Sequence, residues 1–288
     1  MHITPQFLVL ILGLHVALTV GYAGDTLASA EPQTFYEQRL LDAVKEMNTL
    51  DQFATEKERE YGEIQRRFRG VANLFNGIIV ASPDAIEARL IYGKMLDRYG
   101  DRDGARDQFI EVLKRDQSIA VAHQQLGTYS AENNDITRAL AYYLSAIEYA
   151  PNEAVYHFVL GDLLYTFAGQ MIESELLDAG VLQSKMFEAF GKAAELASEN
   201  PVYQFRYGEA FYLFADPDWE AALSHWRTFV RGSDLSAPQA QMITLHIARC
   251  LGEMGQYEEA RERIAEVNSA ELEDLRSALA DAIEEAQM

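Results

Sequence analysis

Apolar residues recur at helical spacing in long stretches of the chain. One stripe, at intervals of three or four residues, consists of Ile64, Phe68, Val71, Phe75 and Ile78. A second stripe near the C-terminus consists of Leu272, Leu275, Leu279, Ala282, Ile283 and Ala286. Polar residues fill the positions between them, so each segment has one face for a core and one for water. This spacing predicts helices rather than strands.

Two helix starts are marked by capping residues. Thr34 with Glu37 and Thr55 with Glu58 have the spacing of a capping box, in which both side chains bond amide groups at the start of a helix. We therefore predict helices over 35–50 and 56–81, which together form an N-terminal hairpin within residues 35–83. Residues 24–34 are mostly small, polar or Pro, and predict a flexible linker.

A period of 34 residues organises the middle of the chain. It relates Gly93, Gly127 and Gly161, and it also relates Ala105 to Ala139 and Phe109 to Tyr143. A small residue at one place in each unit lets two helices approach closely, while the large residue fills the space beside it. The period therefore predicts a repeated helix-turn-helix unit.

The unit at residues 120–153 resembles the tetratricopeptide repeat (TPR) family. The residues at the signature positions of that family are Leu126, Gly127, Ala139, Tyr143, Ala146 and Pro151. The resemblance covers about residues 86–268 and is strongest in the first two units. It implies an all-α solenoid, a right-handed superhelix of about five stacked hairpins within residues 84–268. We expect 35–83 to stack on it as a degenerate hairpin and 269–288 to cap it as a helix.

The third unit carries an insertion. Gly161 and Ala189 are 28 residues apart, whereas Gly127 and Ala139 are 12 apart, so sixteen residues are added at about 170–185. If both helices share them, each grows by about 8 residues, with a turn at Asp178-Ala179-Gly180. The added apolar residues then have to fold over the solenoid or meet a partner.

TPR proteins usually bind peptides or helices on the concave face, which the first helix of each unit lines. Their positions within each repeat place the following candidate residues on the concave face: Lys94, Gln124, Thr128, Phe158, Asp162, Tyr165, Phe205, Glu209 and Tyr212. Members that bind chaperone tails have Lys and Asn in the groove, so Gln124 and Thr128 argue against that activity. The four aromatic residues are interpreted either as anchors for a partner or as part of the core.

The N-terminus predicts export. Residues 7–20 (FLVLILGLHVALTV) are apolar and uncharged, and small residues follow them. This is typical of a signal peptide, cleaved after residue 23 or 30, although residues 1–6 contain no Lys or Arg. A retained membrane anchor is the alternative, but the run is shorter than the roughly 20 residues that span a bilayer. We expect a periplasmic or secreted protein whose mature chain has no integral membrane span.

Composition limits the partners and the stabilising features of the chain. The 24 Lys and Arg against 45 Asp and Glu give a net charge of −21, which argues against nucleic acid as a partner and favours a protein segment that is basic or amphipathic. With 49% apolar and 11% aromatic residues, the chain has enough material for a core. Its single Cys excludes an intrachain disulfide.

No residue pattern predicts an enzyme. His123 and His157 are 34 residues apart, which indicates packing between helices. His246 and Cys250 share a helix face, but two ligands are too few for a closed zinc site. We therefore predict no catalytic residue, metal or cofactor.

Three hypotheses follow. The first is a non-enzymatic scaffold of an exported compartment or cell envelope that binds a partner segment in its groove. The second is a structural component of an envelope or secretion complex that docks through its convex face or its insertion. The third, an enzyme, rests only on scattered His and Cys side chains. The oligomeric state stays open.

Overall fold

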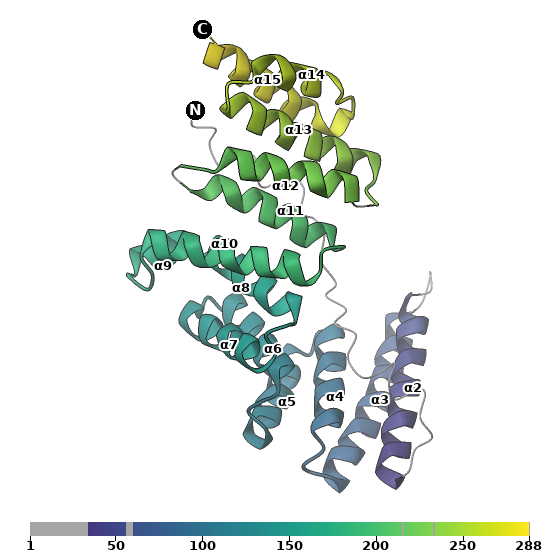
Figure 1. Cartoon of the computed structure of the whole chain (residues 1–288). Coiled ribbons are helices and arrows are strands. Elements are labelled where there is room, and N and C mark those ends of the chain that lie inside the picture. The colour runs from purple at the N-terminus through teal and green to yellow at the C-terminus, as the bar shows by residue number, and fades with distance from the viewer. Residues whose placement is uncertain (1–33, 56–59, 215, 233, 288) are drawn as a thin grey trace. The chain divides into compact units, whose positions relative to one another are not determined.

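The computed structural model describes residues 34–55, 60–214, 216–232 and 234–287. Within these ranges the chain forms α-helices and two short 3-10 helices, and no strand (Figure 1). No helix in the described ranges is both long enough and apolar enough to cross a membrane. The predicted signal peptide lies outside them. The described residues form two compact units, which we call the N-terminal unit (34–152) and the C-terminal unit (153–287).

The N-terminal unit consists of three helical hairpins. They are α2 (Phe35–Thr55) with α3 (Tyr61–Ala81), α4 (Ile86–Arg98) with α5 (Arg102–Arg115), and α6 (Ala120–Glu132) with α7 (Ile136–Tyr149). The capping box predicted at the start of α2 is confirmed, because the Glu37 amide donates to Thr34 Oγ1 at 3.1 Å and the Thr34 amide donates to the Glu37 carboxylate at 2.8 Å. The partner of Thr55 in the second predicted box, Glu58, lies outside the described residues.

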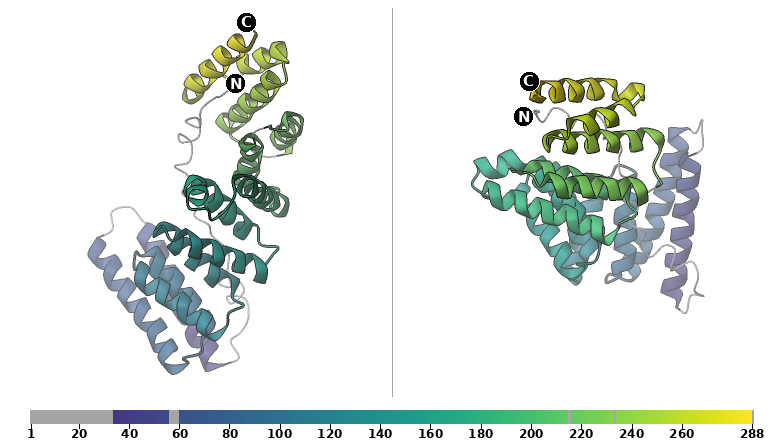
Figure 2. Two further views of the ribbon diagram at one scale, coloured as in Figure 1. Left: turned by 90° about the vertical axis from the view of Figure 1, so that its left-hand side faces the viewer. Right: turned by 45° about the horizontal axis from the view of Figure 1, so that its top comes forward.

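The C-terminal unit contains three further hairpins and a final helix (Figure 2). The hairpins are α8 (Ala154–Thr166) with α10 (Ala179–Leu196), α11 (Pro201–Ala210) with α12 (Trp219–Gly232), and α13 (Ala237–Glu253) with α14 (Tyr257–Ala265). The remaining elements are α9 (Ala168–Glu173), η2 (Phe211–Leu213), η3 (Ala270–Leu272) and α15 (Glu273–Gln287). Leu279 and Ile283 of α15 are buried, and Ile283 packs beside Gly252 of α13. The all-α fold of helical hairpins is thus confirmed.

The recurring glycines mark the closest approach between paired helices. Each faces an aromatic ring on the second helix of its hairpin: Gly93 faces Phe109, Gly127 faces Tyr143, Gly161 faces Phe190 and Gly208 faces Trp226. A Cβ atom placed on these glycines would lie between 2.3 and 3.0 Å from the ring, where ordinary contacts need 3.4 Å or more. The period therefore has a packing cause, because no side chain fits between the ring and the first helix.

The insertion takes a path that differs from the prediction. Helix α8 stays at 13 residues, and a separate six-residue helix, α9, follows it. Helix α10 has 18 residues, four more than α5 or α7. The two helices of the hairpin therefore do not share the insertion equally, which was the condition for each to grow by about 8 residues. Met171 and Leu182 are buried, so the added residues break the first helix and fold back onto the C-terminal unit, which covers apolar surface that a protruding hairpin would expose.

Candidate partner-binding face

Five of the six groove residues predicted in the C-terminal unit lie on two successive first helices. Phe158, Asp162 and Tyr165 belong to α8, and Phe205 and Glu209 belong to α11, whereas Tyr212 lies in η2 directly after α11. Between them lies Arg206, whose role the sequence had not indicated.

Arg206 of α11 connects α11 to α8, the first helices of two successive hairpins. Its Nη2 donates to Asp162 Oδ1 at 2.7 Å, and its Nη1 lies 3.5 Å from Glu209 Oε2. Its guanidinium carbon also lies 4.8 Å from the centre of the Tyr165 ring, within the range of a cation–π contact. Both predicted carboxylates and one predicted aromatic residue thus meet at one guanidinium. The i,i+3 spacing of Arg206 and Glu209 was the only sequence signal for this arrangement.

Glu209 is the more buried of the two carboxylates. Its side chain is 17% exposed, whereas that of Asp162 is 45% exposed. Among the described residues its buried Oε2 has no hydrogen-bond partner, because 3.5 Å from Arg206 is long for a charge-assisted hydrogen bond. Burial raises the pKa of Glu209, and the nearby charges of Arg206 and Arg249 oppose that rise. The carboxylate is therefore held by charge attraction rather than by a well-formed hydrogen bond.

Tyr212 is held in a polar network inside the unit. Its hydroxyl accepts a hydrogen bond from Trp226 Nε1 at 2.6 Å, and it lies 3.2 Å from His246 Nδ1 and 3.7 Å from Cys250 Sγ. Burial raises the pKa of Tyr212 and lowers that of His246 to about 3. Burial also raises the pKa of Cys250 to about 11, so its sulfur stays a thiol at neutral pH.

Arg249 of α13 completes the face. Its guanidinium carbon lies 4.3 Å from the centre of the Tyr212 ring and 5.7 Å from that of Trp219. Its buried Nε has no hydrogen-bond partner in the described part of the chain. We call the surface formed by Asp162, Tyr165, Arg206, Glu209 and Arg249 the first-helix face.

The predicted aromatic anchors differ in the surface that they offer. Phe158 is 8% exposed and lies 4.6 Å from the Tyr203 ring and 5.9 Å from the Phe190 ring, measured between ring centres. Phe205 meets the Trp226 ring edge-on at 5.2 Å and is partly buried. Tyr165 is also only half-buried and lies beside the charged side chains of the face. The binding roles of all these residues stay predictions.

The groove residues predicted in the N-terminal unit are engaged with each other or buried. Gln124 Nε2 donates to Thr128 Oγ1 at 3.1 Å, and Thr128 Oγ1 lies 3.1 Å from the Tyr143 hydroxyl. Gln124 itself is buried. Lys94 is partly buried, and this burial, with a smaller contribution from the charge of Arg98, lowers its pKa.

Candidate chemical residues lie in packing positions. His123 Nε2 lies 2.8 Å from the Gln117 carbonyl oxygen, and its ring lies 5.5 Å from that of Tyr149. Within the described ranges, no three His, Cys, Asp or Glu side chains are grouped to hold a metal ion.

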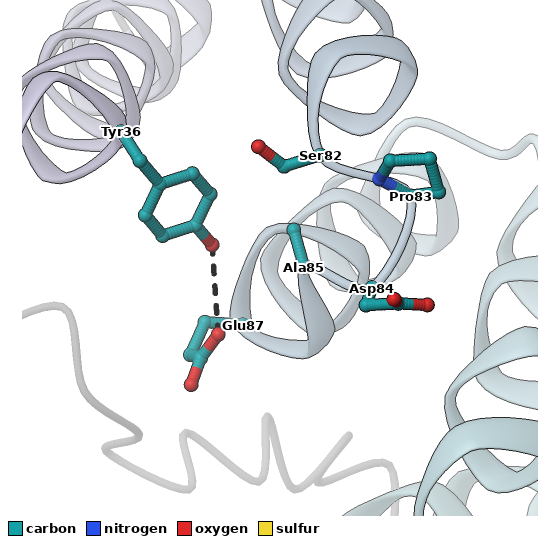
Figure 3. A pocket seen from close by; sticks show the side chains of 6 residues that line it. All are labelled: Tyr36, Ser82, Pro83, Asp84, Ala85 and Glu87. Atoms are coloured by element: carbon teal, nitrogen blue, oxygen red, sulfur yellow. Dashed lines mark hydrogen bonds between the residues drawn. The ribbon is translucent and has the colours of Figure 1, made fainter.

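A cavity of about 390 Å³ lies in the N-terminal unit, between α2 and the loop from α3 to α4 (Figure 3). It is lined by Tyr36, Ser82, Pro83, Asp84, Ala85 and Glu87. The Tyr36 hydroxyl donates to Glu87 Oε2 at 3.5 Å, and burial followed by the charge of Glu87 raises the pKa of Tyr36 to about 12. Asp84 and Glu87 are exposed to solvent, so water already satisfies the charged groups that line the cavity.

Comparison with known proteins identifies the fold but no family. No protein-family model matches the chain, and no curated protein is significantly similar to it in sequence. The solved structure of YrrB, a TPR protein with an unusual peptide-binding site, is similar with a TM-score of 0.55 and 14% identity, covering 74% of this chain and 99% of that one. PilF of Pseudomonas aeruginosa is similar with a TM-score of 0.52 and 13% identity, covering 82% of this chain and 99% of that one. The fold is therefore TPR-like.

Proposed function

We propose that this chain is a protein-binding scaffold that holds a partner segment on its first-helix face. The observation that carries this proposal is the meeting of Asp162, Tyr165, Arg206, Glu209 and Arg249 from three successive first helices. The TPR-like fold supports it, since YrrB has a peptide-binding site on the same kind of framework. Charged groups beside a half-buried aromatic ring suit a segment that has both polar and apolar side chains.

The charge of the C-terminal unit favours a basic partner. Residues 153–288 contain 24 Asp and Glu against 9 Lys and Arg, a formal charge of −15. Asp162 is the accessible carboxylate of the face, so it can exchange Arg206 for a Lys or Arg of the partner. Tyr165 offers a half-buried ring beside Arg206, the residue that pairs with that carboxylate. The partner segment therefore combines an apolar anchor with a neighbouring cation, in extended or helical form.

The scaffold is proposed to act after export, in a periplasmic or secreted setting. The support is the apolar run at residues 7–20 with the small residues after it. N-terminal sequencing of the protein recovered from its native compartment tests this. A start after residue 23 or 30 is expected, and an intact Met1 on a protein retained in the membrane would favour the anchor instead.

The binding proposal is tested with fluorescein-labelled synthetic peptides. One peptide is amphipathic and built from Leu, Phe and Lys, and its twin has Glu in place of Lys. We expect the basic peptide to bind and the acidic twin to fail. Tyr165→Ala should weaken binding by about 1 to 3 kcal/mol, as for a central anchor. Asp162→Asn should mainly slow association and reduce its salt dependence.

Glu284→Gln is the matched control for Asp162→Asn, because Glu284 is exposed on α15 and its replacement removes one negative charge in the same way. Circular dichroism shows whether each variant is folded. If folded Tyr165→Ala and Asp162→Asn bind like the parent, the first-helix face is not the site. The docking hypothesis through another surface then takes its place.

A further inference from the structure

The inserted segment carries the exposed apolar side chains of the C-terminal unit. Ile172 of α9 is 42% exposed and Val181 at the start of α10 is 48% exposed. No other large apolar side chain in the described part of this unit is as exposed. Both residues belong to the added segment at 170–185, which the other hairpins lack, and α9 packs against α10 (Figure 1).

The other face of the segment is anchored in the core. Met171, Leu182 and Met186 are buried, so Ile172 and Val181 are presented from helices whose opposite sides are fixed. An ordered surface loses little conformational entropy when a partner binds. This distinguishes the segment from a loose loop with two apolar residues.

The turn between α9 and α10 is held by specific backbone and side-chain hydrogen bonds. The Leu176 amide donates to the Met171 carbonyl at 2.9 Å and the Glu175 amide donates to the Ile172 carbonyl at 3.0 Å, which is the Schellman arrangement that ends a helix. Glu175 adopts φ of 56° to make it. Asp178 Oδ1 then accepts from the Gly180 amide at 2.9 Å and caps α10.

Acidic residues lie between the two apolar ones in the sequence. Glu173, Glu175 and Asp178 are exposed, and none of them forms an ion pair with a described Lys or Arg. The sequence contains no Lys or Arg between Arg138 and Lys185, and Lys185 pairs with Glu188 at 2.9 Å. Within the described residues, no ion pair therefore neutralises these three carboxylates, and the nearest Lys in the sequence is already paired.

We propose that Ile172, Glu173, Glu175, Asp178 and Val181, which we call the insertion surface, form a second docking site. Its occupant is a basic amphipathic segment of another protein. Apolar side chains of that segment cover Ile172 and Val181, while its Lys or Arg side chains reach the three carboxylates. A second copy of this chain fits poorly, because it brings acidic side chains against acidic side chains. This site does not depend on the first-helix face.

The test measures binding of a fluorescein-labelled amphipathic peptide of Leu and Lys to the Tyr165→Ala protein, in which the first-helix face is weakened. To test the apolar contacts, the double variant Ile172→Ser/Val181→Ser is compared with the single variant Leu144→Ser. Leu144 is 50% exposed on α7 and lies outside the proposed site. To test the charges, the double variant Glu173→Gln/Glu175→Gln is compared with the double variant Glu284→Gln/Glu285→Gln. The latter pair is exposed on α15 and changes the net charge equally.

We expect both insertion-surface variants to weaken peptide binding about tenfold or more, because one removes both exposed apolar side chains and the other removes two of the three carboxylates. The two control variants should bind like the Tyr165→Ala protein, with circular dichroism confirming that all are folded. Equal weakening in the insertion and control variants would overturn the proposal in favour of general attraction to an acidic protein. The proposal would also be overturned, in favour of self-association, if the parent protein sediments as a dimer and the double variant Ile172→Ser/Val181→Ser sediments as a monomer.

Discussion

Replacing Gly208 by Ala should destabilise the C-terminal unit, although Ala is the better helix former. The added Cβ would lie 2.3 Å from Trp226 Cζ2 and 2.5 Å from Cη2, so the ring or the helix has to move by about 1 Å to reach an ordinary contact. Trp226 has no free direction in which to move. It is fully buried, its Nε1 is bonded to Tyr212, and its ring stacks on His246 at 4.3 Å.

The magnitude follows from two opposing terms. Overpacking of a close-packed core costs about 1 to 3 kcal/mol, and the rigid surroundings of Trp226 place this site at the upper end. The higher helix propensity of Ala returns about 1 kcal/mol. The free energy of unfolding should therefore fall by about 2 kcal/mol.

Gly70→Ala is the matched control. Gly70 lies inside α3, and beyond the backbone of its own helix and its chain neighbours no atom of the described residues is within 4 Å of the position of its Cβ. That variant should gain about 0.5 to 1 kcal/mol. Urea unfolding followed by far-ultraviolet circular dichroism measures both. A Gly208→Ala protein as stable as the parent, or stabilised like Gly70→Ala, would refute the account of close helix approach at the repeated glycines.

Three further predictions concern single interactions. Tyr212→Phe leaves the buried Trp226 N–H without its acceptor and should cost about 1 to 3 kcal/mol in urea unfolding, whereas Tyr149→Phe, on an exposed ring, should cost far less. Because burial lowers the pKa of His246 to about 3, the unfolded chain takes up the proton first as the pH falls below about 6.5, and stability drops by up to about 1.4 kcal/mol per pH unit. His246→Gln should show a smaller loss between about pH 7 and about pH 5, and equal pH slopes would contradict this assignment. Glu175→Gly removes the strain of a non-glycine residue in the left-handed conformation and should raise the melting temperature. A lower melting temperature would show that the Glu175 side chain stabilises the turn.

The hairpins could be predicted because their cause is local and repeated. Gly127 and Tyr143 recur with their neighbours every 34 residues, and the packing of one hairpin explains the period. The end of α11 could not be predicted in this way. The repeat phase treated Tyr212 as a residue of the first helix, but α11 ends at Ala210 and η2 follows, so Tyr212 points its hydroxyl at Trp226.

The charged part of the site depended on contacts between distant residues. Asp162 and Arg206 are 44 positions apart, and no spacing rule links them. The course of the insertion was equally open, because Met171 and Leu182 fit a core in a continuous hairpin as well as in a broken one. The left-handed conformation of Glu175 has no sequence signal, since Gly or Asn is the usual residue there.

The most direct test of the proposed function is photo-crosslinking of the basic amphipathic peptide to the folded protein. The photoreactive residue p-benzoylphenylalanine replaces Tyr165 on the first-helix face or, in a second protein, Thr228 on the exposed side of α12. We expect a crosslink from position 165 to the peptide and none from position 228. A peptide that binds both proteins but crosslinks only at position 228, or equally at both positions, would contradict recognition by the first helices.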